Sequence, residues 1–179
     1  MPTLSKTTTK SRPSAGQRRS SAATGEQTAP KDALTLLKED HRTVEDLFAQ
    51  FESARKDERK LLLAQMICEE LTVHATVEET AFYPAVREAL KLKKDQKQLD
   101  EALVEHSTLK WLIARIKAER TASRVLEALT IVLKEYVEHH VKEEEKEMFP
   151  RIRESSLDTH ALGGTLQTLK QKLKSKLKH

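Results

Sequence analysis

A histidine–carboxylate pattern that occurs twice constrains the fold of this 179-residue chain more than any other feature. Residues 74–84 align without a gap on residues 140–150. Each segment begins with His, has Glu four residues later, two bulky apolar residues after eight and nine, and Pro after ten. Another histidine precedes each segment at nearly the same distance, His41 by 33 residues and His106 by 34. The repeat indicates a duplicated helical hairpin that carries a metal site, with half of the ligands from each copy.

The spacing of the apolar residues predicts an all-α fold. Leu, Ile and Val recur at three- and four-residue steps, the period of an amphipathic helix. The chain has 4 Gly and 5 Pro, too few for the many turns of a β fold. Because the expected helices are long and their connections short, we predict an antiparallel up-down-up-down four-helix bundle. The expected helices cover about residues 32–56, 57–90, 99–116 and 121–154.

Local signals set the expected helix boundaries. Asp32 is a good residue to cap the start of the first helix. Pro84 and Pro150 should each kink or break a helix, because proline lacks a backbone N–H and its ring clashes with the preceding turn. Residues 91–100 are mostly charged and predict a connection between the second and third helices.

The two ends of the chain differ in composition from the middle. Residues 1–30 hold almost no large apolar side chains and predict a disordered basic tail. Residues 31–156 are expected to form the bundle. Residues 157–179 predict a basic amphipathic helix, interrupted at Gly163-Gly164, that packs on the bundle through its leucines.

Six residues of the repeat should converge inside the bundle. Residues four apart share a helix face, so each His–Glu pair points the same way, and each pair lies on the apolar stripe of its helix. Two carboxylates buried without partners would each cost several kcal/mol, and a bound cation removes that cost. The predicted metal ligands are therefore His41, His74, Glu78, His106, His140 and Glu144.

Several neighbouring residues compete for these roles. His139 precedes His140, but the repeat aligns His139 on a valine. Glu145 is an alternative to Glu144 as the carboxylate ligand if the helix is locally overwound. The other nearby carboxylates, Glu79, Glu143 and Glu147, are expected to form a solvated face.

The ligand set indicates the kind of metal. Six nitrogen and oxygen ligands exceed the usual four of a structural zinc site. Imidazole with carboxylate suits iron or manganese, and the two-fold repeat suits two ions that share the glutamates. The same residues could also bind zinc adventitiously, so zinc is kept as an alternative metal. An open position would accept O₂, NO or peroxide.

These residues resemble the hemerythrin-like, HHE cation-binding domain family over about residues 32–155. The matching motifs are Glu39-Asp40-His41, residues 74–84, Glu105-His106 and residues 140–150. The resemblance implies a four-helix bundle with two iron ions bridged by oxo or hydroxo groups and by carboxylates. It implies the same six ligands, with Glu78 and Glu144 bridging.

One position departs from the oxygen-carrying members of that family. They have a further histidine one turn after the third one, and this chain has Lys110 there. A lysine is normally protonated and would not ligate a metal. Reversible O₂ transport is therefore not expected, and iron repair or sensing members are more similar. Tyr136, one turn before His140, is expected either to reach the site or to lie in the core.

The sequence supports two classes of function. The first is a di-iron protein that binds, senses or detoxifies O₂, NO or peroxide, in iron homeostasis or stress response, with turnover undecided. The second is a helical interaction module whose basic tails bind nucleic acid or an acidic partner. Residues 160–179 carry five lysines and no acid, but the middle of the chain is acidic, which argues against nucleic acid. One cysteine, no apolar run of membrane-spanning length and no secretory signal predict a cytoplasmic protein.

Overall fold

The computed structural model describes residue 3 and residues 31–177, and these residues form helices without strands. The predicted disordered tail lies outside the described residues, apart from residue 3. Two of the segments, η1 and η2, are π-helical turns that continue the preceding helix. The helical segments are α1 (Ala33–Ser53), α2 (Asp57–Val77), η1 (Glu78–Phe82), α3 (Tyr83–Ala89), α4 (Lys93–Ala118), α5 (Arg124–Glu143), η2 (Glu144–Met148), α6 (Phe149–Arg153) and α7 (Thr159–Leu177).

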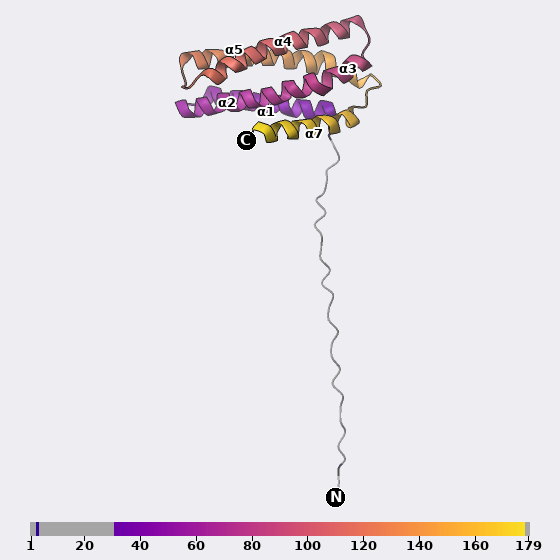
Figure 1. Cartoon of the computed structure of the whole chain (residues 1–179), viewed down its shortest axis with the longest axis horizontal. Coiled ribbons are helices and arrows are strands. Elements are labelled where there is room, and N and C mark those ends of the chain that lie inside the picture. Colours follow the sequence, from indigo (N-terminus) through magenta and orange to yellow (C-terminus); the bar gives the residue numbers. More distant parts are fainter. Residues whose placement is uncertain (1–2, 4–30, 178–179) are drawn as a thin grey trace.

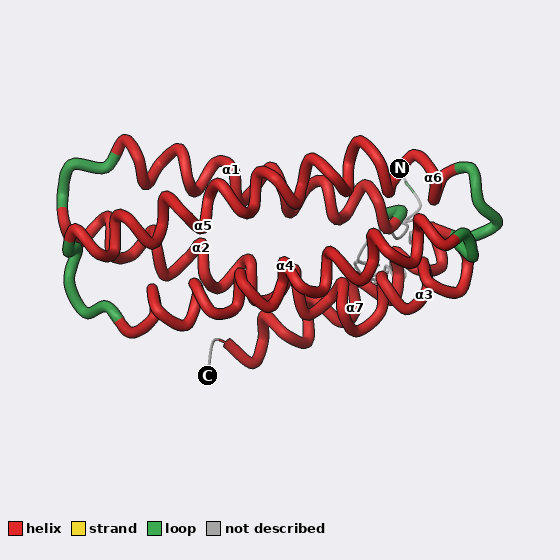
Figure 2. Tube along the Cα trace, turned by 90° about the horizontal axis from the view of Figure 1, so that it is seen from above, coloured by secondary structure: helices red, strands yellow, loops and turns green. Residues whose placement is uncertain are grey.

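Four long helices form the predicted bundle. Figure 1 shows α1, α2, α4 and α5 side by side along the long axis, and Figure 2 shows the connecting loops gathered at the two ends. Helix α1 packs on α2, α2 on α4, and α4 on α5. The all-α, up-down-up-down prediction is therefore confirmed. None of the described helices has the length and apolar character needed to cross a lipid bilayer.

Capping explains where the helices begin. The Asp32 side chain accepts hydrogen bonds from the backbone N–H groups of Leu34 and Thr35, as predicted, and Ser123 caps α5 in the same way. The predicted connection over residues 91–100 was too long, because α4 already starts at Lys93. Lys and Gln are good helix formers, so the charged stretch joins the helix rather than a loop.

The proline that ends each copy of the repeat is accompanied by a widened helical turn rather than a break. The backbone N–H of Tyr83 bonds the carbonyl of Glu78, five residues back, and the N–H of Phe149 bonds that of Glu144. Proline cannot donate to the carbonyl four residues before it and its ring crowds that turn, so the helix relaxes into a π turn and then continues. Each π turn begins at a predicted ligand glutamate.

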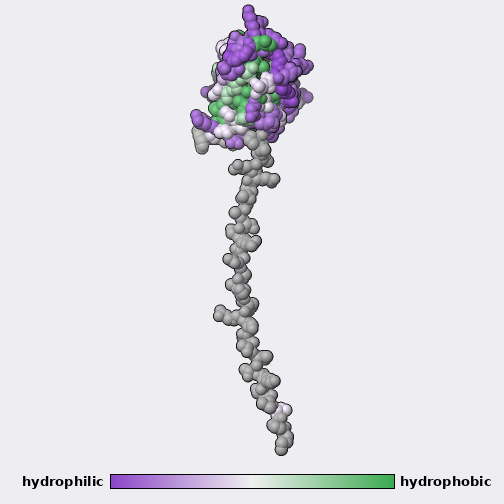
Figure 3. Space-filling model, turned by 90° about the vertical axis from the view of Figure 1, so that its right-hand side faces the viewer, coloured by the Kyte–Doolittle hydropathy of each residue, from purple (hydrophilic) through white to green (hydrophobic). Residues whose placement is uncertain are grey.

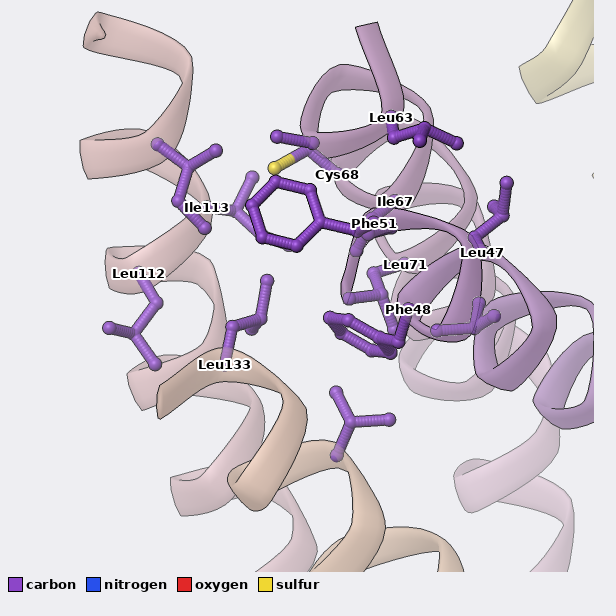
Figure 4. Packing of buried hydrophobic residues seen from close by; sticks show 14 of the residues in the cluster. Leu47, Phe48, Phe51, Leu63, Ile67, Cys68, Leu71, Leu112, Ile113 and Leu133 are labelled. Carbon is purple, nitrogen blue, oxygen red and sulfur yellow. The ribbon is translucent and has the colours of Figure 1, made fainter. Parts of the chain in front are cut away.

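Two apolar clusters lie at the two ends of the bundle interior. One includes Phe51, near the end of α1, and Ile67, in the middle of α2, and the other includes Phe82 and Phe149 at the π turns. Figure 4 shows Cys68 among the leucines and Phe51 of the first cluster, where burial raises the pKa of its thiol to about 12. In Figure 3, hydrophilic residues gather along the top and right of the visible bundle end, and hydrophobic residues show between them and the left edge. The predicted ligands form a layer between the two clusters.

The C-terminal helix differs in one respect from the prediction. Helix α7 runs through Gly163-Gly164 without interruption and packs along α1 and α2 (Figure 1). A Cβ atom on Gly163 would lie 2.9 Å from the backbone nitrogen of Ala33 and overlap the carbonyl of Lys31. The glycine therefore allows close approach between two helices rather than ending one, since its neighbours hold it in helical geometry.

Candidate metal centre

The structure brings all six predicted ligands together, and each has a relative exposure of 5% or less. The histidines form two pairs. His41 of α1 and His74 of α2 have ring centroids 4.9 Å apart, and His106 of α4 and His140 of α5 have centroids 4.7 Å apart. We call these pairs the first half and the second half of the site. Each half comes from one copy of the sequence repeat.

The two glutamates lie between the halves. The Oε2 atom of Glu78 is 3.2 Å from Nε2 of His74 and 3.4 Å from Nε2 of His106. The Oε2 atom of Glu144 is 3.3 Å from Nε2 of His41 and 3.8 Å from Nε2 of His140. Each carboxylate thus contacts one histidine from each half, the arrangement expected of a carboxylate that bridges two cations.

The outer nitrogens of two histidines face carboxylates from the π turns. Nδ1 of His41 lies 2.8 Å from Glu145, and Nδ1 of His106 lies 3.0 Å from Glu79. These two carboxylates occupy equivalent positions of the repeat, each directly after a central glutamate. A carboxylate at Nδ1 fixes the ring so that Nε2 points inward, and this is how metal-ligating histidines are commonly oriented.

The other two histidines face the residue that precedes a histidine in the sequence. Nδ1 of His140 lies 2.7 Å from Glu105, which precedes His106. Nδ1 of His74 lies 3.6 Å from Asp40, which precedes His41, and this contact is too long for a hydrogen bond. All four rings therefore present Nε2 to the centre and Nδ1 to a carboxylate.

The residues near the site differ in part from the sequence prediction. The prediction that Glu79 lies on a solvated face was wrong, because it contacts His106 and, at 2.5 Å, Lys110. His139 is 61% exposed at its side chain and points away from the centre. Glu145 lies on the outer nitrogen of a histidine rather than among the inward-facing atoms.

Tyr83 lies at the centre of the site, although the sequence pattern did not predict a role for it there. Its hydroxyl donates to Glu144 at 3.0 Å and lies 3.3 Å from Nε2 of His140 and 3.4 Å from Nε2 of His106. It was counted only as a bulky apolar residue of the repeat, although its counterpart is Phe149. That difference was the available signal. Tyr136 is 45% exposed, so neither role predicted for it was right.

The charges in the site are strongly coupled. Burial alone would lower the pKa of His140, but the nearby Glu144 and Glu105 carboxylates raise it to about 9. The pKa of His41 is raised for the same kind of reason, against the effect of burial. Burial raises the pKa of Asp40, but contacts with His74 and Lys170 reverse this and lower it. Burial next to carboxylates raises the pKa of the Tyr83 phenol well above its usual value.

The buried polar atoms at the centre fit a cation. Within the described residues, Nε2 of His41, Nε2 of His74, Oε1 of Glu78 and Oε2 of Glu144 are buried without a hydrogen-bond partner. Such atoms would each cost on the order of 1–3 kcal/mol if nothing satisfied them. Two groups of residues each place their ligand atoms within 4.8 Å of one another: His41, His74, Glu78 and Glu144, and Glu78, His106 and His140.

A small cavity adjoins the histidines. Its volume is about 10 Å³, which is close to that of one water-sized sphere. The four histidines and Asp40 line it together with aliphatic side chains, including Val44, Leu71 and Leu109. The arrangement offers a small ligand both polar and apolar contacts.

Comparison with known proteins agrees with this geometry. The profile of the hemerythrin HHE cation-binding domain matches residues 32–152. The chain belongs to this family. Its described fold also resembles the crystal structure of a hemerythrin HHE cation-binding domain-containing protein from Mycobacterium kansasii, with a TM-score of 0.68 and 21% identity, over 82% of this chain and 89% of that one.

A curated relative has a different kind of name. A DNA nickase from Nostoc sp. is 28% identical over 144 residues, which are 79% of this HHE domain protein. The match spans 40% of the length of the nickase. Metal-cation binding is thus supported by family membership and by the grouped histidines and glutamates, whereas the ligand that the centre handles needs a proposal.

Proposed function

We propose that this protein binds two iron ions between its four core helices and uses them to bind, sense or detoxify O₂, NO or peroxide. His41 and His74 would hold one ion, and His106 and His140 the other. Glu78 and Glu144 would bridge both. Bound iron would supply the redox chemistry and the open coordination position for the small ligand.

One observation carries this proposal. Every one of the four imidazoles presents a buried Nε2 to the centre while a carboxylate faces its Nδ1. A buried histidine that serves only packing needs no such partner on both sides. Two central carboxylates, each in contact with both halves, complete a set of nitrogen and oxygen ligands that suits iron or manganese.

The surroundings favour a small ligand. The cavity beside the histidines is close to the size of a single water, and aliphatic side chains form part of its lining. O₂, NO and peroxide are small enough for such a space, whereas a metabolite of ordinary size is not. We therefore extend the proposal to a role in stress response or iron handling, in which such small ligands act.

Metal content is the decisive measurement. We expect about two iron ions per chain in protein prepared without a histidine tag, with near-ultraviolet charge-transfer bands after air oxidation. Anaerobic titration with ferrous iron should give the same stoichiometry. If the reconstituted chain takes up no metal, the six residues are structural and the proposal is wrong. Manganese or zinc at the same stoichiometry would keep the site and change the chemistry.

DNA binding is the second candidate, and the name of the Nostoc relative is the observation that favours it. It predicts salt-sensitive binding to duplex DNA that disappears when residues 1–30 are deleted. Within α7, Lys170 and Lys174 are engaged by Asp40 and Glu70, which leaves fewer lysines for phosphates. Absence of binding at low salt would remove this candidate.

A further inference from the structure

Helix α7 lies outside the segment that matches the family profile, yet one of its lysines contacts the polar surroundings of the centre. Nζ of Lys170 forms an ion pair with Oδ1 of Asp40, whose other oxygen faces His74. We propose that Lys170 is a positioning residue, which holds Asp40 behind His74 and thereby strengthens cation binding in the first half. The inference rests on the metal centre proposed above.

The repeat shows why the first half needs this lysine. In the second half, Glu105 reaches Nδ1 of His140 directly at 2.7 Å. Its counterpart Asp40 is one methylene shorter and stops 3.6 Å from His74. Among the described residues, Oδ2 of Asp40 and Nδ1 of His74 have no hydrogen-bond partner. A buried aspartate in that position stays aimed at the imidazole only if its other oxygen is held, and Lys170 holds it.

Contacts of α7 with α1 and α2 place Lys170 beside Asp40. Leu166, one turn before it, is fully buried against the bundle, and Gly163 lets the helix approach the start of α1 closely. Lys174, one turn after it, pairs with Glu70 of α2 at 2.7 Å. Contacts on both sides therefore fix the height of Lys170 along α1 and α2, because residues four apart share a helix face.

The two lysine pairs of α7 provide a matched comparison. Both Lys170 and Lys174 anchor the helix, but Glu70 contacts none of the proposed ligands, whereas Asp40 faces His74. If Lys170 only anchors α7, replacing either lysine should have similar consequences. If Lys170 positions Asp40, only its replacement should change cation affinity.

The experiment measures both iron affinities of the full-length chain by anaerobic chelator competition, alongside thermal unfolding of the metal-free protein. Lys170→Met should weaken the binding of one of the two ions about ten-fold. This is the lower end of the loss that follows when a hydrogen-bonding partner of a metal ligand is removed. Lys170→Arg should restore most of that loss, and Lys174→Met should change neither affinity by more than about two-fold. Asp40→Asn should weaken the same ion, and adding Lys170→Met to it should cause no further loss.

Each outcome decides the matter. Selective weakening of one ion by Lys170→Met, with rescue by Arg and no additivity with Asp40→Asn, supports the positioning role. Equal effects of Lys170→Met and Lys174→Met, or two unchanged affinities, would overturn it while leaving the metal centre in place. Failure of the wild-type chain to bind any iron would overturn the metal centre itself, and the positioning role with it. Because unfolding is measured without metal, loss of α7 docking is seen separately from loss of affinity.

Discussion

The two halves of the centre repeat one another in their inner residues and differ in what lies behind them. Each half has two histidines with inward Nε2 atoms, and one histidine of each half contacts Glu78 and one contacts Glu144. In the first half Phe149 stacks on His41, with centroids 6.1 Å apart, and α7 covers Asp40. In the second half Tyr83 takes the place of the phenylalanine and brings a hydroxyl into the site.

The comparison separates the residues proposed to bind a cation from the residues that alter its surroundings. Histidine, central glutamate and the carboxylate behind each ring recur in both copies, which is the pattern expected if each of them contributes to holding a cation. The residues that differ change local polarity and cover without removing a ligand. We therefore expect two ions with unequal environments, and variants of one half should affect the two ions unequally.

The largest expected effect comes from a residue that both halves share. Glu78→Gln should abolish tight binding of both ions, because a neutral amide cannot supply negative charge to two cations at once. Anaerobic ferrous titration measures the stoichiometry, and Glu147→Gln, an exposed glutamate of the second copy of the motif, is the control. Retention of two tightly bound ions in Glu78→Gln would show that this carboxylate does not bridge.

Replacing one histidine should separate the halves. His74→Ala should leave about one ion per chain, and so should His140→Ala, because each pair is proposed to hold its own ion. We expect the affected ion to bind at least about a hundred-fold more weakly, since partners behind ligands alone account for ten- to hundred-fold. His139→Ala is the control, because that side chain is largely exposed. Loss of both ions from either single variant would argue for one strongly coupled site.

The fold and the inner part of the site could be predicted because they are periodic. Helix faces and the four-residue step from His74 to Glu78 follow from helix geometry alone. The role of Glu79 could not be read in this way. It lies one residue from a central glutamate, and the π turn that alters which residues face inward depends on the backbone around Pro84.

Other features depend on contacts between distant segments. Tyr83 points into the site because α3 continues the π turn. Its counterpart in the second copy is Phe149, so packing at this position requires an aromatic ring but no hydroxyl. Gly163 was expected to interrupt a helix because the neighbouring backbone of α1 is not visible in the local sequence. Sequence periodicity therefore predicts the apolar stripe and the six candidate ligands, whereas tertiary contacts determine which residues lie behind them.

The stability of the metal-free chain and its affinity for iron should depend on pH in opposite directions. The pKa of His140 is raised to about 9, so its protonated form stabilises the metal-free fold fully below the unfolded pKa of about 6.5. That contribution, at most about 3 kcal/mol, should disappear as pH rises through about 9. Iron affinity should change in the opposite direction and rise with pH, because bound histidines must be deprotonated.

Chemical denaturation of the metal-free chain between pH 6 and about 10 measures this effect, with His140→Asn as the control that should reduce the pH dependence. His41, whose pKa is also raised, should leave part of the dependence in place. A wild-type profile that is flat over this range would contradict the charge coupling within the second half.

The smallest expected effect tests the side-chain difference between the halves. Tyr83→Phe makes the second half like the first, and it removes a hydroxyl that donates to Glu144 at 3.0 Å. Loss of one hydrogen bond to a charged group corresponds to about 1.5–3 kcal/mol in stability, and we expect a smaller loss, about ten-fold, in the affinity of one ion. Phe149→Tyr is the matched exchange and should perturb the other ion instead. Equal changes at both ions in Tyr83→Phe would mean that the phenol acts on the shared glutamate rather than on one half. A visible absorption band of the oxidised protein that disappears in Tyr83→Phe would instead identify Tyr83 as a ligand and make the two halves unequal in their ligand sets.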